Sequence, residues 1–256
     1  MAKGKFRALV LGASAENGTG WSIAQLLAKE GASLAVGARS QDGIAKLASQ
    51  INAYAIRCDC TIEAEVAAMA DAAVISCGGN LDAAVLVAGD GVLGTVDAIS
   101  EAELQRATSL NYTAAVYFVR HMARRMNDHG SIVLMSSVVA TRPWPGYFAY
   151  ACAKSAVQTL VEYAALEYAP RGIRINAVIP SPIQTPAALK FLSVPQVQKA
   201  LYREIPLGRA VLPSEVAEAV VWLATRAASI TGVSLFVDGG MHLRRPPFPD
   251  ELQGGA

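Results

Sequence analysis

Short runs of apolar, mostly β-branched residues alternate with longer helical stretches over almost the whole chain. Several of these runs are apolar almost without interruption, which is typical of parallel strands that helices cover on both faces. Seven runs are predicted as strands: Arg7–Leu11, Ser33–Ala38, Tyr54–Cys58, Ala83–Ala88, Ser131–Ser136, Ile173–Ile179 and Val233–Val237. Because parallel neighbours need crossover connections, this pattern favours an α/β fold.

The stretches between these runs have the length and apolar spacing of helices. Six are predicted as helices: Trp21–Lys29, Gln41–Gln50, Ile62–Ile75, Glu101–Met126, Ala151–Ala169 and Pro213–Ala228. Three of them are expected to begin with a hydroxyl cap, from Thr61, Ser100 and Ser214, each followed closely by a glutamate. An acid near the positive end of a helix stabilises it.

The alternation runs from end to end with no internal repeat and no low-complexity linker. It predicts one α/β domain, a Rossmann-type doubly wound parallel sheet of about seven strands with helices on both faces. We assign residues 1–245 to this single domain. The proline-rich C-terminal tail, residues 246–256, is predicted to be non-helical.

The composition indicates a large buried core and gives no sign of a charged binding surface. Hydrophobic residues make up 53% of the 256 residues and charged residues 17%, which excludes a disordered chain. The net charge of +1 gives no electrostatic basis for binding nucleic acid or an anionic membrane. No apolar run approaches the roughly 18–20 residues that span a bilayer.

The cysteines and the N-terminus bear on the compartment. Residues 1–6 lead into an apolar run of only strand length, which is not typical of a signal peptide. Cys58, Cys60, Cys77 and Cys152 form no Cys-x-x-Cys motif and no zinc-binding spacing. We therefore expect free thiols, buried or half-buried, in a cytoplasmic protein without a metal site.

A glycine-rich turn follows the first predicted strand and precedes a helix. It reads Gly12-Ala13-Ser14-Ala15-Glu16-Asn17-Gly18-Thr19-Gly20, with the spacing Gly-x5-Gly-x-Gly. Such a turn lets the backbone approach a pyrophosphate, while the helix N-terminus supplies amide donors and a positive dipole. Because this is the first strand-to-helix turn of an alternating chain, it predicts a dinucleotide site.

The end of the second predicted strand bears on the choice of cofactor. A cofactor with a free 2′-hydroxyl usually meets an Asp or Glu there, but the segment ends in Arg39 and Ser40. Guanidinium binds phosphate in a bidentate manner. We therefore expect Arg39 and Ser40 to favour NADP, with NAD as the alternative. Glu16 opposes this preference unless its side chain turns outward.

A tyrosine and a lysine form the core of a catalytic arrangement. Tyr150 and Lys154 lie four residues apart near the start of a predicted helix, so they share one face. A phenol has a pKa near 10 and needs a nearby cation to act as an acid–base catalyst at neutral pH. Ser137 follows the fifth predicted strand, at the sheet edge where α/β sites form. Asn111 lies within the preceding long helix.

These segments together resemble a short-chain dehydrogenase/reductase of the short single-domain branch, over almost the whole chain. The matching segments are Gly12–Gly20, Asp59, Ala88-Gly89, Asn111, Gly130–Ser137, Tyr150 with Lys154, Asn176–Pro186 and Val237–Gly240. The resemblance implies NAD(P)-dependent oxidation of an alcohol or reduction of a ketone by an oxidoreductase.

The resemblance also implies a role for each catalytic residue. Tyr150 would be the general acid or base, and Ser137 would hold the substrate oxygen. Lys154 would bind the nicotinamide ribose and lower the pKa of Tyr150. Asn111 would position a water that leads protons out.

For the cofactor, the resemblance places Asp59 at the adenine edge and Ile183 and Thr185 at the nicotinamide carboxamide. The remaining cofactor-binding residues that it implies, besides Arg39, Ser40, Tyr150 and Lys154, are Gly12, Ser14, Gly18, Thr19, Gly20, Cys60, Ala88, Gly89 and Pro180.

Three departures from the family pattern stand out. The glycine loop is two residues longer than Gly-x3-Gly-x-Gly, as in the enoyl-reductase relatives, but their Tyr-x6-Lys spacing would put the lysine at Val157. The family's Asn-Asn-Ala-Gly is Leu86-Val87-Ala88-Gly89, and its Pro-Gly is Pro180-Ser181. Carbonyl or alcohol chemistry is therefore favoured over ene reduction.

The expected function is reversible hydride transfer between NADP(H) and a small-molecule ketone or secondary alcohol. The segments 142–148 and 189–192 are rich in aromatic and aliphatic residues. They would either line a pocket for an apolar or cyclic substrate or pack against another subunit. The resemblance implies pairing through the helices after the fourth and fifth strands, as a homodimer or homotetramer. The alternatives are an idle nucleotide-binding regulatory scaffold and ene reduction.

Overall fold

Seven parallel strands form one sheet in the order β3-β2-β1-β4-β5-β6-β7 in the computed structural model, which describes residues 5–253. The strands are β1 (Arg7–Leu11), β2 (Ser33–Ala38), β3 (Tyr54–Arg57), β4 (Leu81–Leu86), β5 (Met126–Met135), β6 (Arg174–Pro180) and β7 (Ser234–Val237). Every adjacent pair is parallel. The predicted single-domain, doubly wound α/β fold is confirmed.

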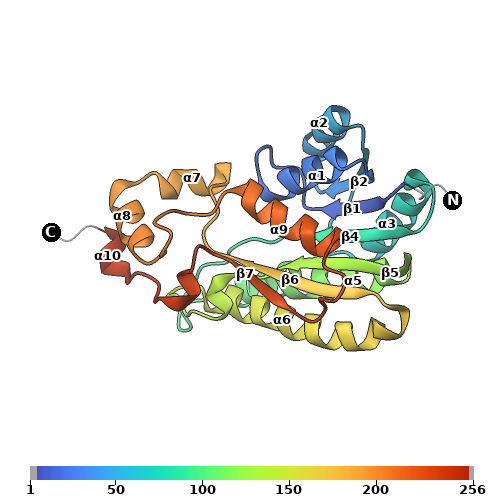
Figure 1. Cartoon of the computed structure of the whole chain (residues 1–256). Coiled ribbons are helices and arrows are strands. Elements are labelled where there is room, and N and C mark those ends of the chain that lie inside the picture. Colours follow the sequence, from blue (N-terminus) through green and yellow to red (C-terminus); the bar gives the residue numbers. More distant parts are fainter. Residues whose placement is uncertain (1–4, 254–256) are drawn as a thin grey trace.

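Helices cover both faces of this sheet (Figure 1). They are α1 (Thr19–Lys29), α2 (Gln41–Ile51), α3 (Glu63–Cys77), α4 (Glu101–Thr108), α5 (Ala114–Ala123), α6 (Phe148–Tyr168), α7 (Pro186–Leu192), α8 (Pro195–Arg203), α9 (Pro213–Thr225) and α10 (Pro249–Gln253). One hydrophobic cluster joins α3, α5 and α6 to one sheet face, and another joins α1, α2 and α9 to the opposite face. Two buried faces explain the nearly continuous apolar strands.

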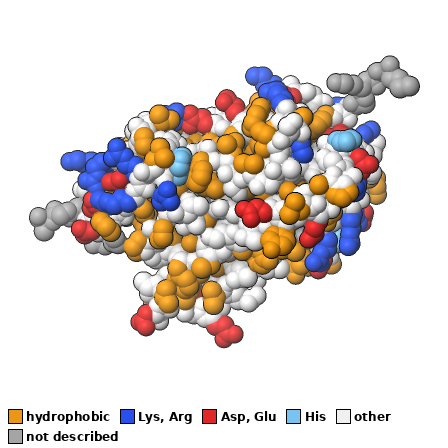
Figure 2. Space-filling model, turned by 60° about the horizontal axis from the view of Figure 1, so that its bottom comes forward, with side chains coloured by type: hydrophobic (Ala, Val, Ile, Leu, Met, Phe, Trp, Pro, Cys, Tyr) orange, Lys and Arg blue, Asp and Glu red, His pale blue; other side chains and the backbone are white. Residues whose placement is uncertain are grey.

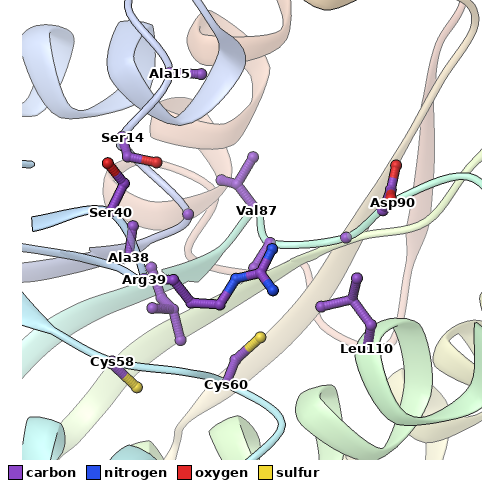
Figure 3. A pocket seen from close by; sticks show the side chains of 14 residues that line it. Ser14, Ala15, Ala38, Arg39, Ser40, Cys58, Cys60, Val87, Asp90 and Leu110 are labelled. Atoms are coloured by element: carbon purple, nitrogen blue, oxygen red, sulfur yellow. The ribbon is translucent and has the colours of Figure 1, made fainter. Parts of the chain in front are cut away.

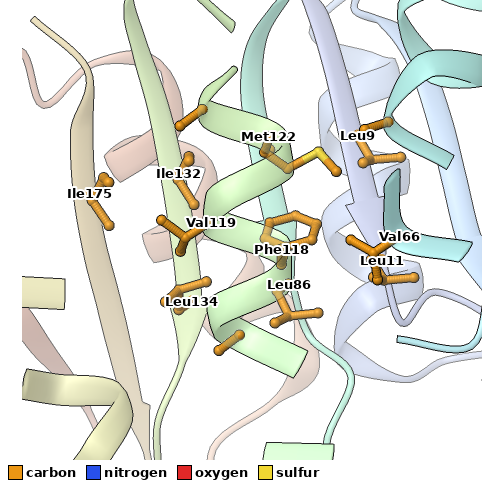
Figure 4. Close-up of a cluster of buried hydrophobic side chains, with 14 of the residues drawn as sticks. Leu9, Leu11, Val66, Leu86, Phe118, Val119, Met122, Ile132, Leu134 and Ile175 are labelled. Atoms are coloured by element: carbon orange, nitrogen blue, oxygen red, sulfur yellow. The ribbon is translucent and has the colours of Figure 1, made fainter. Parts of the chain in front are cut away.

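The core on the α5 side is built around large, fully buried side chains. Phe118 and Met122 of α5 lie against Leu9 of β1 and Ile132 of β5 (Figure 4), and all four are solvent-inaccessible. Removing one such side chain from water stabilises the fold by about 1.5–3 kcal/mol. This packing fixes the strands whose carboxyl ends carry the site.

The strand order reverses next to β1, which pairs with β2 on one side and β4 on the other. The chain connections leave β1 and β4 toward opposite faces, so a crevice opens outside their carboxyl ends. The glycine loop (residues 12–20) follows β1, and Ala88 and Gly89 follow β4. Both segments therefore reach the crevice.

The predicted helix Glu101–Met126 was wrong in its extent. It is divided into α4, a π-helical turn at Ser109–Thr113 and α5, which ends at Ala123. Strand β5 then begins at Met126, earlier than predicted, because Met126 pairs with Leu81 of β4. The polar residues between Met126 and Ser131 had concealed this end of the strand.

Ser100 caps α4 as predicted, in a reciprocal capping box with Glu103. The other two predicted caps were wrong: α3 begins after Ile62, and α9 begins after Leu212 with Pro213 in its first turn. Proline suits the first helical position because its missing N–H has no helical partner there.

Three helices were not predicted. The short helices α7 and α8 each begin with a proline, and Thr185 caps α7 by accepting a hydrogen bond from the Ala188 amide. The tail contains α10, which corrects the prediction that it is non-helical. Residues 254–256 of the tail and residues 1–4 of the predicted N-terminus lie outside the described part.

All four cysteines are free thiols. Cys58, Cys60 and Cys77 are buried, whereas Cys152 on α6 is exposed, contrary to the expectation that all would be at least half-buried. Within residues 5–253 no helix has the length and apolar character to cross a membrane.

Candidate active site

A cavity of about 330 Å³ lies at the carboxyl ends of β1, β2 and β4 (Figure 3). Its walls include many of the predicted cofactor residues, namely Gly12, Ser14, Arg39, Ser40, Cys60, Ala88 and Gly89. Asp90 and Leu110 also line it, although they were not predicted. Asp90 follows directly after Gly89, so its place in the sequence was an available signal.

Two glycines bring the loop after β1 close to its neighbours. Gly12 has φ +101°, and a Cβ there would lie 2.4 Å from the Ala88 nitrogen. A Cβ on Gly20 would lie 2.2 Å from the Gly12 oxygen. No other residue fits at either position, so the glycine loop closes tightly over the end of β4. Gly18 and Thr19 lie at the start of α1.

Arg39 extends across this cavity toward Cys60 (Figure 3). Its exposed side chain has no ion pair or hydrogen bond to any residue in the described part of the chain. Ser40 caps α2 by accepting a hydrogen bond from the Gly43 amide at 3.4 Å. An unpaired guanidinium thus faces the cavity beside the start of a helix, an arrangement that suits an anion.

Glu16 turns away from the cavity. It pairs with Lys46 of α2 at 2.6 Å, and both side chains are about half exposed. Glu16 is not part of the cavity wall. The carboxylate that would oppose a phosphate is therefore compensated by a lysine.

Asp59 follows β3 but does not line the cavity. Its Oδ1 atom accepts hydrogen bonds from the Thr61 amide at 2.9 Å and the Thr61 hydroxyl at 2.7 Å. Burial opposes ionisation, but these hydrogen bonds outweigh it and hold the pKa of Asp59 below its usual value.

A second cavity, of about 270 Å³, contains the hydroxyl groups of the predicted catalytic set. Ser137, Tyr150, Pro180 and Ile183 all line it. Thr185 does not line it and instead caps α7. The structure therefore brings Tyr150 and Ser137, the predicted catalytic tyrosine and serine, together beside two of the predicted cofactor residues, Pro180 and Ile183.

Burial dominates the acidity of Tyr150. It raises the pKa of the phenol to about 12, with smaller contributions in the same direction from Tyr147 and Asp90. The hydrogen bond with Ser137 lowers the pKa in part. The sequence predicted a lowering of this pKa by Lys154, but in this structure the one lowering contribution comes from Ser137, and desolvation outweighs it.

Lys154 is buried beneath the tyrosine. Its Nζ atom donates a hydrogen bond to the Met135 carbonyl at 2.9 Å and lies 5.6 Å from the centre of the Tyr150 ring. Desolvation lowers the pKa of this amine to about 8. Ser136 and Gln158 hold the helix backbone here, since Ser136 Oγ donates to the Lys154 carbonyl and accepts from Gln158 Nε2.

Asn111 lies on the π-helical turn and is 2% exposed. Its Nδ2 atom donates to the carbonyls of Asp90 at 3.0 Å and Ala107 at 3.1 Å, and its Oδ1 atom accepts from the Asp90 amide at 3.2 Å. The side chain thus fastens the loop after β4 to the end of α4. Such π-helical turns occur frequently at functional sites.

Gly89 lies between Asn111 and Lys154. A Cβ there would lie 2.9 Å from Asn111 Oδ1 and 3.0 Å from Lys154 Nζ. The loop after β4 can pass over the buried amine only because this residue has no side chain.

The lowered pKa of Lys154 predicts a pH-dependent stability. Between pH 8 and pH 10 the unfolded lysine keeps its proton while the folded one loses it, so the unfolded state binds more protons and stability rises with pH. Relative to Lys154→Met, the free energy of unfolding of the wild type should rise by roughly 2 kcal/mol over this range. Urea denaturation of both proteins at several pH values measures it, and parallel curves would contradict a depressed pKa.

Comparison with known proteins identifies the family to which the chain belongs. A family model described as enoyl-(acyl carrier protein) reductase matches residues 12–242. The 3β-hydroxysteroid dehydrogenase 1 of Eggerthella lenta is 37% identical over 251 residues, covering 94% of this chain and 95% of that protein. The cis-4-hydroxycyclohexanecarboxylate dehydrogenase of Sinomonas cyclohexanicum is 35% identical over 243 residues, covering 91% and 95%.

Solved structures agree in fold. A short-chain type dehydrogenase/reductase from Mycobacterium ulcerans superposes with a TM-score of 0.91 at 27% identity, covering 98% of this chain and 100% of that one. An actinorhodin polyketide ketoreductase with NADPH gives a TM-score of 0.86 at 27% identity, covering 94% and 99%. The chain belongs to the short-chain dehydrogenase/reductase family of NAD(P)-dependent oxidoreductases.

Proposed function

We propose that this protein is an NADP(H)-dependent ketoreductase and alcohol dehydrogenase that acts on a small ketone or secondary alcohol, with Tyr150 as the general acid or base. The observation that carries the proposal is the grouping of half-buried Ser137 and Tyr150 at the wall of the second cavity with Lys154 buried behind Tyr150. A hydroxyl and a phenol at a cavity wall, with an ammonium close to the phenol, are the groups that carbonyl reduction needs.

Bound NADPH would supply the hydride at the carbonyl carbon of the substrate. Ser137 and Tyr150 would both hydrogen-bond the carbonyl oxygen, and the Tyr150 hydroxyl would release its proton to that oxygen as charge develops. Lys154, with its pKa of about 8, is mostly charged at neutral pH and stabilises the phenolate that results. A phenol whose pKa is about 12 is protonated at neutral pH, which favours the direction of reduction.

For the cofactor, Arg39 and Ser40 would bind the 2′-phosphate of NADP. The support is the unpaired guanidinium at the cavity wall together with the Glu16–Lys46 ion pair, which removes the opposing charge. Gly12, Ser14, Ala88 and Gly89 would contact the remainder of the dinucleotide through their backbone.

The alternatives have weaker support. The enoyl-reductase spacing puts Val157 in the lysine position, and Val157 is 1% exposed within the core of the α6 side. A regulatory scaffold without activity would have no use for a lysine buried at the cost of its solvation. Turnover of simple ketones separates both alternatives from the proposal.

We propose association into a homodimer or homotetramer through the helices after β4 and β5. On α6, Tyr163 is 65% exposed and Leu166 is 77% exposed. Tyr112 and Leu160 line a groove next to Tyr163. The side of the molecule turned forward in Figure 2 carries several hydrophobic patches between few charges. Exposed apolar patches of this kind mark interfaces.

Tyr150→Phe should abolish turnover and leave the affinity for NADPH nearly unchanged, because the ring keeps its packing and loses only its transferable proton. The expected loss in kcat is about 10²–10⁴-fold. Steady-state kinetics with a panel of ketones and a fluorescence titration with NADPH measure the two effects. Lys154→Met should lower both kcat and the affinity for NADPH. Activity of Tyr150→Phe within a few-fold of the wild type would exclude the tyrosine as the acid.

Gly89→Ala should displace the Lys154 amine and lower kcat/KM by at least about tenfold, since the new Cβ would lie 3.0 Å from Nζ. Gly91→Ala, two residues along the same loop, is the matched control: its Cβ would meet only Tyr147, at an ordinary 3.7 Å. Equal activities of the two variants would show that the loop tolerates a side chain over the lysine.

Arg39→Ala should remove most of the preference for NADPH and hardly affect the use of NADH. A charge-assisted hydrogen bond is worth about 1.5–3 kcal/mol, so the wild type should prefer NADPH by at least about tenfold in kcat/KM. Lys46→Ala is an informative companion, since it releases Glu16. Equal use of both cofactors by the wild type would contradict the assignment.

A further inference from the structure

The second cavity, which would hold the substrate, is rich in hydroxyl groups. Its walls include four hydroxyl-bearing residues close to the reacting centre besides Tyr147: Ser136, Ser137, Tyr150 and Ser181. The Ser136 hydroxyl forms hydrogen bonds with the Lys154 carbonyl and the Gln158 side chain, and Ser137 forms a hydrogen bond with Tyr150. Ser181 is 4% exposed, and its Oγ atom has no partner within residues 5–253.

A buried hydroxyl without a partner is unfavourable, because it loses its hydrogen bonds to water and gains none. Native structures keep few such groups, and those that remain call for an explanation. The fold of residues 5–253 makes no use of this hydroxyl.

The backbone around Ser181 is rigid. Pro180 ends β6 and Pro182 follows, so both neighbours have a fixed φ and Ser181 itself is restricted to extended conformations. The side-chain torsion remains free. Because Ser181 Oγ is itself shielded in this structure, a turn about this torsion is what would bring the hydroxyl to the cavity, where it would meet a ligand without any movement of the backbone.

The chemistry of the cavity limits what can meet this hydroxyl. No charged side chain belongs to the cavity wall in the described part of the chain, so nothing there neutralises a carboxylate or a phosphate. Most of the remaining wall is apolar, with Trp144, Phe191 and Leu192 among its members. A volume of about 270 Å³ is at the small end of ligand pockets and suits one ring.

We propose that Ser181 binds a second, uncharged oxygen of the substrate. This rests on the proposed function and names its substrate class: small cyclic ketones or alcohols that carry a further hydroxyl or carbonyl group on an otherwise apolar ring. Ser137 and Tyr150 hold the reacting oxygen, and Ser181 holds the other one. Ser181 thereby fixes which way the ring lies in the cavity.

The test uses matched pairs of ketones with NADPH: 2-, 3- and 4-hydroxycyclohexanone and the corresponding methylcyclohexanones. The hydroxyl and methyl groups are similar in size. The kcat/KM for each hydroxycyclohexanone divided by that for its methyl partner therefore reports hydrogen bonding. The wild type should prefer the hydroxyl compound of at least one pair. Ser181→Ala should reduce that ratio by roughly fivefold or more, and comparing the two enzymes cancels the intrinsic reactivities of the ketones.

Controls separate this role from others. Ser181→Cys keeps the size but supplies a weak donor, and should behave like the alanine variant. Ser49→Ala, on the exposed side of α2, should leave the ratio unchanged. The thermal midpoint of Ser181→Ala should equal or exceed that of the wild type, because an unpaired buried hydroxyl is removed. A structural role would lower it.

Four outcomes would overturn the inference. An unchanged ratio in Ser181→Ala excludes the contact, and a ratio lost only in Tyr147→Phe assigns it to the neighbouring phenol. A weaker affinity for NADPH in Ser181→Ala with an unchanged ratio assigns the hydroxyl to the cofactor. Wild-type protein that reduces none of the six ketones would contradict the substrate class, and separate inactivity on open-chain ketones would contradict the proposed function itself.

Discussion

The burial of one amine sets the requirements for the rest of the site. Lys154 lies out of contact with water, and keeping a charge there is costly unless polar groups surround it. The Met135 carbonyl at the end of β5 accepts a hydrogen bond from its Nζ atom, and Ser136 holds the backbone of its helix. Gly89 leaves the room that the amine needs. The carboxyl ends of two adjacent strands and one helix are thereby fixed relative to each other around a single nitrogen.

The loops of the site are rigid because their backbones approach neighbouring segments closely. Gly12 meets the end of β4 at a distance that no side chain permits. Asn111 fastens the following loop to α4 through two hydrogen bonds with the Asp90 backbone and one with the Ala107 carbonyl. Loops with satisfied backbone groups and no free space keep a fixed geometry. The short segment between Ala88 and Asp90 consequently joins the wall of the nucleotide cavity to Lys154 and Asn111.

The sequence predicted those parts of the site that depend on local geometry. The four-residue spacing of Tyr150 and Lys154 is a property of any helix, and the glycine loop follows from its place after the first strand. The π-helical turn around Asn111 was concealed, because the apolar pattern continues through it. The start of β5 at Met126 depends on pairing with β4. The missing partner of Ser181 is a tertiary property, since burial and the surrounding side chains decide it.

The two cavities differ in the charge of their walls. On the nucleotide side, Arg39 has no ion pair within residues 5–253, whereas Glu16 and Asp90 are paired with Lys46 and Arg106, so the guanidinium of Arg39 is available to an anionic ligand. The substrate side has only hydroxyl groups and apolar surface. In such surroundings a hydrogen bond is stronger than in water, and a misplaced polar group costs more. In the proposed function, charge would therefore select the cofactor, whereas shape and the position of neutral oxygens would select the substrate.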